Sequence, residues 1–309
     1  MAIRSALRCA TLLLATLIVS TAADAQIFRA YLASDGNDAN PCTLPAPCRL
    51  LPAALAAVSA GGDIWILDSA NFNTSTVTVS KSVTILAVPG VVGSFVGNGS
   101  DALLIDGAGI NVRLQNLRFR YLSGGGATKG IVVANATSVT LENCDVSGFP
   151  SYGLAVNSDT EFSVSGSAFF RNNTAIFVTG AAKGTIARTK ISSPPVGYGI
   201  YAAPAVFTNA IRLNISDTEI AGGVMGYVTQ TGSNVMATIT RSVFADCGQC
   251  IQQQGSAGSI ISVSNSVVTG AAWTFVNMGP QSAFETFQNN VISGPASASS
   301  GTFTNRTYQ

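Results

Sequence analysis

The sequence predicts an all-β protein, a single-stranded right-handed parallel β-helix of about ten rungs, and three observations carry this prediction. The chain of 309 residues is 47% hydrophobic and only 10% charged, whereas soluble proteins average about 25% charged residues. Apolar anchor residues recur along the chain at spacings of 22 to 29 residues. Within each repeat the apolar residues alternate, which is the period of strands and not of helices.

The chain begins with a segment, residues 1–25, that has the features of a secretory signal peptide. Arg4 and Arg8 precede a short apolar run, and Ala23-Asp24-Ala25 fits the small-residue cleavage site. The run is too short to span a bilayer, and no other long apolar run follows. The sequence therefore predicts an exported protein in the periplasm, at the cell surface or outside the cell, without a membrane span.

Charge and composition exclude several classes of function. Removal of residues 1–25 leaves equal numbers of basic and acidic residues, so the chain lacks the excess of Lys and Arg that binds nucleic acid or anionic membranes. The sequence contains no histidine. This excludes Ser-His-Asp and Cys-His nucleophile systems and histidine metal sites.

Residues 26–62 are predicted to form a leader and a capping helix. Cys42 and Cys48 enclose a tight loop, and in an exported chain this predicts a disulfide. A helix is expected from Leu50 to Ala60, because Pro52 suits its start and Gly61-Gly62 its end. Such a helix would cover the first rung, whose open edge would otherwise pair with other chains.

The repeats are predicted to occupy residues 63–292, with first strands at 64–67, 77–79 and 83–85. Because each repeat is too small to bury its own apolar face, stacking as a coil forms one continuous core, and such connections are right-handed in nearly all cases. Each anchor has an apolar partner five positions later. These pairs are Leu114 with Phe119, Leu141 with Val146, Val164 with Phe169, Ile186 with Ile191, Ile215 with Ile220, Ile239 with Phe244, Val263 with Val268, and Phe287 with Ile292.

A turn is expected between the two apolar positions of each repeat, because Asn, which tolerates a left-handed backbone, is frequent there. The column comprises Asn116, Asn143, Gly166, Arg188, Asp217, Arg241, Asn265 and Asn289. Cys247 and Cys250 lie in a strand-and-turn context, which favours a structural disulfide or plain thiols over a redox motif. Cys144 remains as a buried thiol, and nothing in the tail, residues 293–309, predicts a cap.

At this point the repeats resemble a known fold. Val112 to Phe119 is similar to the second strand, asparagine turn and third strand of right-handed parallel β-helix proteins of the pectate-lyase-like superfamily, and Gly130 to Val133 resembles the next first strand. The leader from Ser34 to Cys42, followed by Cys48 and the helix, is similar to a group of uncharacterised exported bacterial β-helix repeat proteins. The resemblance implies the fold and no single activity, because the superfamily contains lyases, hydrolases, esterases, epimerases and non-catalytic adhesins.

The resemblance also implies where chemistry would occur. In the superfamily's lyases, acidic residues on the outward face of the first strands hold calcium, and an Arg or Lys abstracts a proton. Here that face carries a lone carboxylate, Asp106, whereas calcium takes six to eight oxygen ligands. The sequence therefore predicts no metal site and no cofactor, with calcium the one ion that the resemblance leaves open. The remaining outward positions are uncharged: Val132, Ala134, Ala155, Asn157, Phe177, Thr179, Tyr201, Ala203, Val228, Gln252, Gln254, Val276 and Met278.

Five charged residues near the turn column have two interpretations. In a catalytic one, Lys190 or Arg188 is a proton-abstracting base and the carboxylates orient a substrate. In a structural one, which we favour, the five form a ladder of opposite charges between neighbouring rungs. The five are Arg188, Lys190, Asp217, Glu219 and Arg241.

Aromatic and amide residues on the first-strand face indicate a ligand-binding surface. Asn157, Phe177, Tyr201 and Gln252 are expected to line one side of the rod, with Tyr152, Tyr198 and Tyr227 nearby. Aromatic faces with amide neighbours suit sugar rings, although exposed aromatics are also ordinary on a charge-poor surface. The sequence thus favours a non-catalytic exported protein that binds polysaccharide. The alternative is a polysaccharide-active enzyme, a uronate polymer lyase or epimerase.

Overall fold

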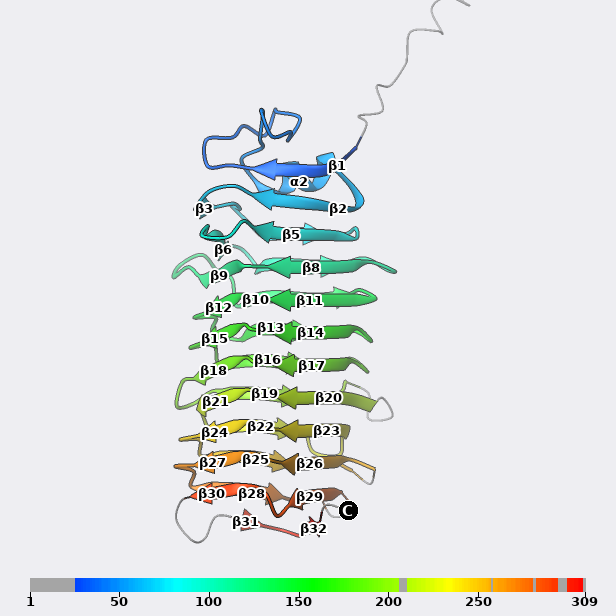
Figure 1. Ribbon diagram of the computed structural model, residues 1–309, viewed down its shortest axis with the longest axis vertical. Helices are drawn as coiled ribbons and strands as arrows, with labels where there is room; N and C mark the ends of the chain where they lie inside the picture. Colours follow the sequence, from blue (N-terminus) through cyan, green and yellow to red (C-terminus); the bar gives the residue numbers. More distant parts are fainter. Residues whose placement is uncertain (1–25, 206–209, 257, 280–281, 294–298, 308–309) are drawn as a thin grey trace, which may run out of the picture.

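The computed structural model describes residues 26–205, 210–256, 258–279, 282–293 and 299–307, so the expected signal peptide lies outside the described residues. The chain forms a right-handed parallel β-helix of about nine turns, which appears as a rod in Figure 1. The predicted fold class is confirmed, and the number of turns is close to the ten expected. In the part of the chain that the structure describes, no helix is long and apolar enough to cross a membrane.

Three parallel sheets form the walls of the coil. We number them by the position of their strands within a rung. Sheet 1 contains β4 (Val77–Val79), β7 (Asp101–Asp106), β10 (Lys129–Asn135), β13 (Tyr152–Val156), β16 (Thr174–Val178), β19 (Tyr198–Ala202), β22 (Met225–Thr229), β25 (Gln249–Gln253), β28 (Trp273–Asn277) and β31 (Ser299–Ser300).

Sheet 2 follows sheet 1 within each rung and is the longest of the three. It contains β1 (Ile27–Leu32), β2 (Val58–Ile66), β5 (Val83–Ala87), β8 (Asn111–Gln115), β11 (Ser138–Glu142), β14 (Glu161–Ser165), β17 (Lys183–Ala187), β20 (Ala210–Ser216), β23 (Asn234–Thr240), β26 (Ile260–Ser264), β29 (Ala283–Phe287) and β32 (Thr304–Arg306).

Sheet 3 completes the rung. It contains β3 (Ala70–Asn71), β6 (Gly93–Gly97), β9 (Leu117–Tyr121), β12 (Asp145–Ser147), β15 (Ala168–Phe170), β18 (Lys190–Ser193), β21 (Glu219–Gly222), β24 (Val243–Ala245), β27 (Val267–Thr269) and β30 (Val291–Ser293).

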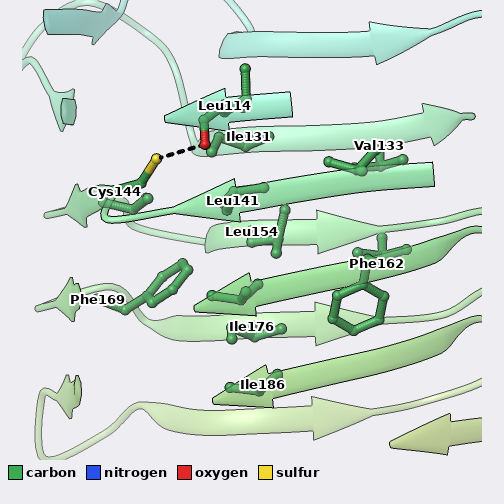
Figure 2. Packing of buried hydrophobic residues seen from close by; sticks show 14 of the residues in the cluster. Leu114, Ile131, Val133, Leu141, Cys144, Leu154, Phe162, Phe169, Ile176 and Ile186 are labelled. Carbon is green, nitrogen blue, oxygen red and sulfur yellow. Dashed lines mark hydrogen bonds between the residues drawn. The ribbon is translucent and has the colours of Figure 1, made fainter. Parts of the chain in front are cut away.

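The core consists of columns of apolar side chains stacked rung upon rung. Leu114 pairs with Leu141, which pairs with Val164 in the next strand of sheet 2, and all three are fully buried. Figure 2 shows this packing around Leu141, Leu154 and Phe169. Each such side chain contributes about 1.5–3 kcal/mol by its burial. The anchor columns inferred from the sequence are therefore the core, except at the last repeat.

The last repeat departs from the expected register. Val263 pairs with Thr286 and not with Phe287, so the anchor assigned to Phe287 was wrong by one residue. Ile292 does pair with Val268, as expected, but it is 49% exposed because β30 is the last described strand of sheet 3. In the described part of the chain, sheet 3 is thus uncovered after β30, whereas β31 and β32 extend sheets 1 and 2 by one more strand each.

The predicted left-handed turns between sheets 2 and 3 are confirmed at seven of the eight positions, and Asn289, in the shifted last repeat, does not have this conformation. Asn116 and Asn143 have φ angles of 57° and 53°, and Asp217 has 52°, all in the left-handed region. Gly166, Arg188, Arg241 and Asn265 share this conformation. Asn is well suited to it, while residues with longer side chains adopt it at a cost of roughly 1–2 kcal/mol.

A column of polar side chains, which was not predicted from the sequence, lies just inside these turns. Ser242 donates through Oγ to the Thr240 carbonyl (2.9 Å) and accepts from the Thr218 N–H (3.3 Å). Members of the column satisfy backbone groups that the turn leaves without strand partners. We call it the inner ladder, which comprises Cys144, Ser167, Thr189, Thr218, Ser242, Ser266 and Asn290.

The N-terminal end is closed by the leader and by helix α2 (Leu51–Ala57). Leu51, Ala54 and Leu55 are buried against the first rungs, as expected of a cap. The helix is shorter than predicted, and Gly61-Gly62 does not end it. Both glycines lie in β2, where the pairing with β1 shifts register.

The leader also covers the free edge of β1, which belongs to sheet 2. The Tyr31 N–H donates to the Cys42 carbonyl (2.8 Å), and the Cys48 N–H donates to the Tyr31 carbonyl (2.9 Å). Cys42 and Cys48 are joined by the predicted disulfide. Cys247 and Cys250 are also disulfide-bonded, in the turn from β24 into β25, and Cys144 is free and buried.

Candidate functional site

Four aromatic rings form a continuous strip on the outer face of sheet 1. Tyr152 stacks on Phe177 with ring centroids 4.4 Å apart and planes within 7°. Phe177 contacts Tyr201 at 5.5 Å, and Tyr201 stacks on Tyr198 at 5.5 Å. The rings come from β13, β16 and β19, so the strip covers three rungs, or roughly 10 Å at the usual strand spacing.

The strands explain why these rings face outward. In β16, Ile176 and Val178 point into the core and are fully buried, so Phe177 between them points away from it. All four rings are half-buried, which leaves part of each aromatic surface accessible. We call Tyr152, Phe177, Tyr198 and Tyr201 the aromatic strip.

The surroundings of Tyr201 favour its neutral form. Burial is the main factor that raises the pKa of Tyr201, and the nearby hydroxyl groups of Tyr198 and Tyr152 raise it further. Tyr201 therefore retains its proton, and with it a hydrogen-bond donor, at pH values where a free tyrosine begins to ionise.

Two of the four expected ligand-binding residues belong to this strip, and the other two do not. Asn157 is exposed and accepts a hydrogen bond from Thr179 through Oδ1 (3.2 Å), at the end of β13. Gln252 is only 2% exposed and contacts the Met278 sulfur (3.0 Å), so it does not face solvent as predicted. In the register of sheet 1, Val228 lies on the rung between Gln252 and Tyr201.

Other expectations about this face also need correction. Val132, Ala155, Val228 and Val276 point away from the core, but each is at most 5% exposed. Tyr227 is fully buried and aligned with Ile200 and Ile251, so it is a core residue and not a turn residue. Alternation predicted which way these side chains point but not whether other atoms cover them.

Four of the five charged candidates form two ion pairs between neighbouring rungs, as the structural interpretation predicts. Arg241 binds Asp217 through two hydrogen bonds, Nε to Oδ1 (2.8 Å) and Nη2 to Oδ2 (2.9 Å). Lys190 lies opposite Glu219 in sheet 3, with 3.6 Å between Nζ and Oε2. The side chains of these two pairs are 41–70% exposed, so they lie on the outer surface of the rod.

The ion pair does not prepare Asp217 for proton transfer. Hydrogen bonding from Arg241 lowers the pKa of Asp217, while the carboxylate raises the pKa of Arg241. A carboxylate with a lowered pKa is a weaker base. Arg188 adds a further positive charge near Asp217 from the preceding turn.

No group of three or more Asp, Glu, Cys or His side chains is placed to hold a metal ion within residues 26–205 or the later described segments. Asp106, the lone carboxylate expected on this face, is exposed at the end of β7. The residues present do not fit the acidic cluster that calcium requires.

Comparison with known proteins agrees with the fold. Residues 101–299 match the family described as the right-handed β-helix region, which is more than half of the chain. The chain belongs to this right-handed β-helix family. No curated protein matches the sequence.

Among solved structures, this β-helix is similar to the pectate lyase Pel9A, with a TM-score of 0.59 and 15% identity over 89% of this chain and 79% of the lyase. It is also similar to the GH136 lacto-N-biosidase from Eubacterium ramulus, with a TM-score of 0.48 and 12% identity over 91% of this chain and 67% of that one. At 15% identity, the likeness to Pel9A shows the fold alone.

Tyr152 and Tyr198, expected only near the ligand-binding surface, are part of the strip itself. In the repeat alignment, both precede the Gly of the Gly-Leu or Gly-Ile pair that opens a first strand. The register brings Tyr152 and Tyr198 to the same position two rungs apart. This shared position in the repeat could have predicted that both rings join the strip.

Proposed function

We propose that this β-helix protein is exported and binds polysaccharide through the aromatic strip, without catalysing a reaction on it. The observation that carries the proposal is the continuous row of four contacting rings along the rod. Sugar rings present an apolar face that packs on aromatic rings, and a strip parallel to the coil axis suits a chain of successive sugars. The likeness to Pel9A shows the fold that offers such a face.

Binding rather than bond cleavage fits the distribution of charge. The strip carries rings and hydroxyl groups, and Asn157 lies at its edge. The five charged candidates lie around the turns between sheets 2 and 3 and along sheet 3, where two pairs neutralise each other. Two disulfides support export, because disulfides persist in oxidising compartments. The signal-peptide features of residues 1–25 support it as well.

A glycan array followed by titration of the best ligand tests the binding. The double variant Phe177→Ala/Tyr201→Ala removes the two central rings, and we expect affinity to fall at least about tenfold, since each lost aromatic contact is worth roughly 1 kcal/mol or more. Phe28→Ala is the matched control, because Phe28 is 64% exposed on β1 at the far end of the rod.

The outcomes separate clearly. Weaker binding by the double variant with unchanged binding by Phe28→Ala supports the proposal, provided that thermal unfolding shows both variants folded. Equal binding by all three proteins, or no ligand on the array, contradicts it. N-terminal sequencing of the protein from a secreting host tests export, with Gln26 expected as the first residue.

A further inference from the structure

A cavity lies on the outer face of sheet 3. Its volume is about 510 Å³, within the range of small-ligand pockets. Register stacks Arg120, Ser147 and Phe170 on successive rungs, so the small Ser147 leaves a gap between a guanidinium group and an aromatic ring. The remaining lining residues are Tyr121, Asp145, Gly148, Arg171 and Ser192.

Positive charge exceeds negative charge around this cavity. Asp145 is the single carboxylate at the cavity, and its Oδ2 lies 3.7 Å from Arg118 Nε and 3.9 Å from Arg120 Nη2. Arg171 has no carboxylate within ion-pair distance among the described residues. The guanidinium groups of Arg120 and Arg171 thus line the cavity with one carboxylate, which is itself paired with Arg118, and this excess of positive charge favours an anionic ligand.

Arg171 occupies a backbone position where other rungs use glycine. The residue after the second outward position of sheet 3 is left-handed in five rungs. Glycine occurs in three of these, Gly148, Gly222 and Gly270, and Asp246 in a fourth. Arg171 adopts the same conformation with φ of 53°. A left-handed backbone is disfavoured for a residue with a Cβ, and such strain is found at functional positions.

Two further polar atoms at the cavity have no hydrogen-bond partner among the described residues. They are Oδ1 of Asp145 and Oγ of Ser147, both shielded from solvent. A carboxylate oxygen accepts hydrogen bonds and a hydroxyl does either. Both side chains are only partly buried, so rotation of either one turns these atoms toward the cavity, where they pair with the hydroxyl groups of a ligand.

From these observations we propose that the cavity binds a sugar ring that bears a carboxylate or sulfate group. Arg171 and Arg120 bind the anion, since guanidinium groups pair with planar oxyanions through two parallel hydrogen bonds. Phe170, which is 38% exposed, packs on the face of the ring. This site lies on a different sheet from the aromatic strip and does not depend on it.

Ligand-observed NMR titration with glucuronate, glucose 6-sulfate, glucose and acetate tests the proposal. We expect an anionic sugar to bind more tightly than glucose, which lacks the charge, and than acetate, which lacks the ring. Arg171→Gly should weaken this binding about tenfold or more, as loss of a charge-assisted hydrogen bond implies. The variant should fold at least as well as the parent, because glycine suits its backbone.

Arg188→Gly is the matched control. Arg188 is also a left-handed arginine, with φ of 48°, but it lies in the turn between sheets 2 and 3 and outside the cavity. It should leave binding unchanged. Tighter binding of either anionic sugar with this pattern supports the site and identifies its anion.

Three results would overturn the site. The first is that glucose or acetate binds as tightly as the anionic sugars. The second is that Arg171→Gly binds like the parent, and the third is that Arg188→Gly weakens binding as much as Arg171→Gly does.

Discussion

The hydroxyl groups of the inner ladder are small features with a large expected effect on stability. Each one forms a hydrogen bond with a backbone group in the turn that has no partner in the neighbouring strands. A buried polar group that loses its partner destabilises a protein by about 1–3 kcal/mol. The inner ladder therefore stabilises the turns by hydrogen bonds on their core side. The left-handed residues of the turn column determine the backbone conformation of the same turns.

Ser242→Ala tests this role. The change removes the donor to the Thr240 carbonyl and the acceptor for the Thr218 N–H, so we expect a loss of about 1–3 kcal/mol in the free energy of unfolding. Thr238→Ala, at an exposed position of neighbouring β23, should change it by less than about 0.5 kcal/mol. Denaturant titration of both variants measures the difference, and equal effects would contradict the ladder.

Cys144 is the one member of the ladder with a thiol, and its environment makes it inert. Burial raises its pKa to about 12, and its sulfur lies 3.5 Å from the Leu114 carbonyl (Figure 2). Because the thiolate is the reactive form, the folded protein should not react with a thiol reagent at pH 8. One thiol should become reactive on unfolding without reductant, once residues 1–25 are removed. Reaction in the folded state would show that the site opens.

At the scale of the element, the left-handed turn decides how a rung passes from sheet 2 to sheet 3. Asn143 has φ of 53° and donates its N–H to the Ser165 carbonyl in the next rung. A residue that has a Cβ but lacks the short amide side chain of Asn is less stable in this left-handed conformation.

Paired substitutions at this turn measure the backbone effect. Asn143→Ala should lower the free energy of unfolding by about 1–2 kcal/mol, since alanine is disfavoured in the left-handed region. Asn143→Gly should lose less, because glycine adopts that region freely. If both variants lost the same amount, the side chain and not the backbone would be responsible.

The elements also show what the sequence could reveal and what it could not. Asn143 and Asn116 marked the turns because their chemistry matches the backbone they adopt. Gly61-Gly62 misled, because glycine suits both a helix end and the irregular pairing of β2 with β1. The aromatic strip was predicted in part, since alternation shows that Phe177 faces outward. The contact between Gln252 and Met278 could not be predicted, because these two residues lie 26 positions apart and only the fold brings them together.

At the scale of the whole molecule, the rod has two different ends. The leader and α2 close the end at β1, where backbone hydrogen bonds from Tyr31 are already satisfied. At the other end, Val291 and Ile292 are 59% and 49% exposed. Because each rung contacts only its neighbours, the stability of a rung depends on its own contacts. The rungs at the covered end should therefore be more stable than those at the exposed end.

Hydrogen exchange should reveal this gradient directly. We expect the amides of β14 and β17, in the middle of sheet 2, to exchange slowest and those of β30 and β32 fastest, because end rungs open locally. The variant Cys42→Ala/Cys48→Ala should accelerate exchange in β1 and the leader and leave β17 unchanged. Uniform acceleration along the rod would instead mean that the coil unfolds as one unit.

The closed end has a consequence for the way the chain acquires its structure. Synthesis proceeds from the end that is capped, so the first rung can form with its edge already covered. Each later strand then needs only the strand about one repeat earlier, which is finished by the time it appears, and no segment waits for a distant partner. We therefore expect the coil to grow in one direction, with every completed rung serving as the template for the next.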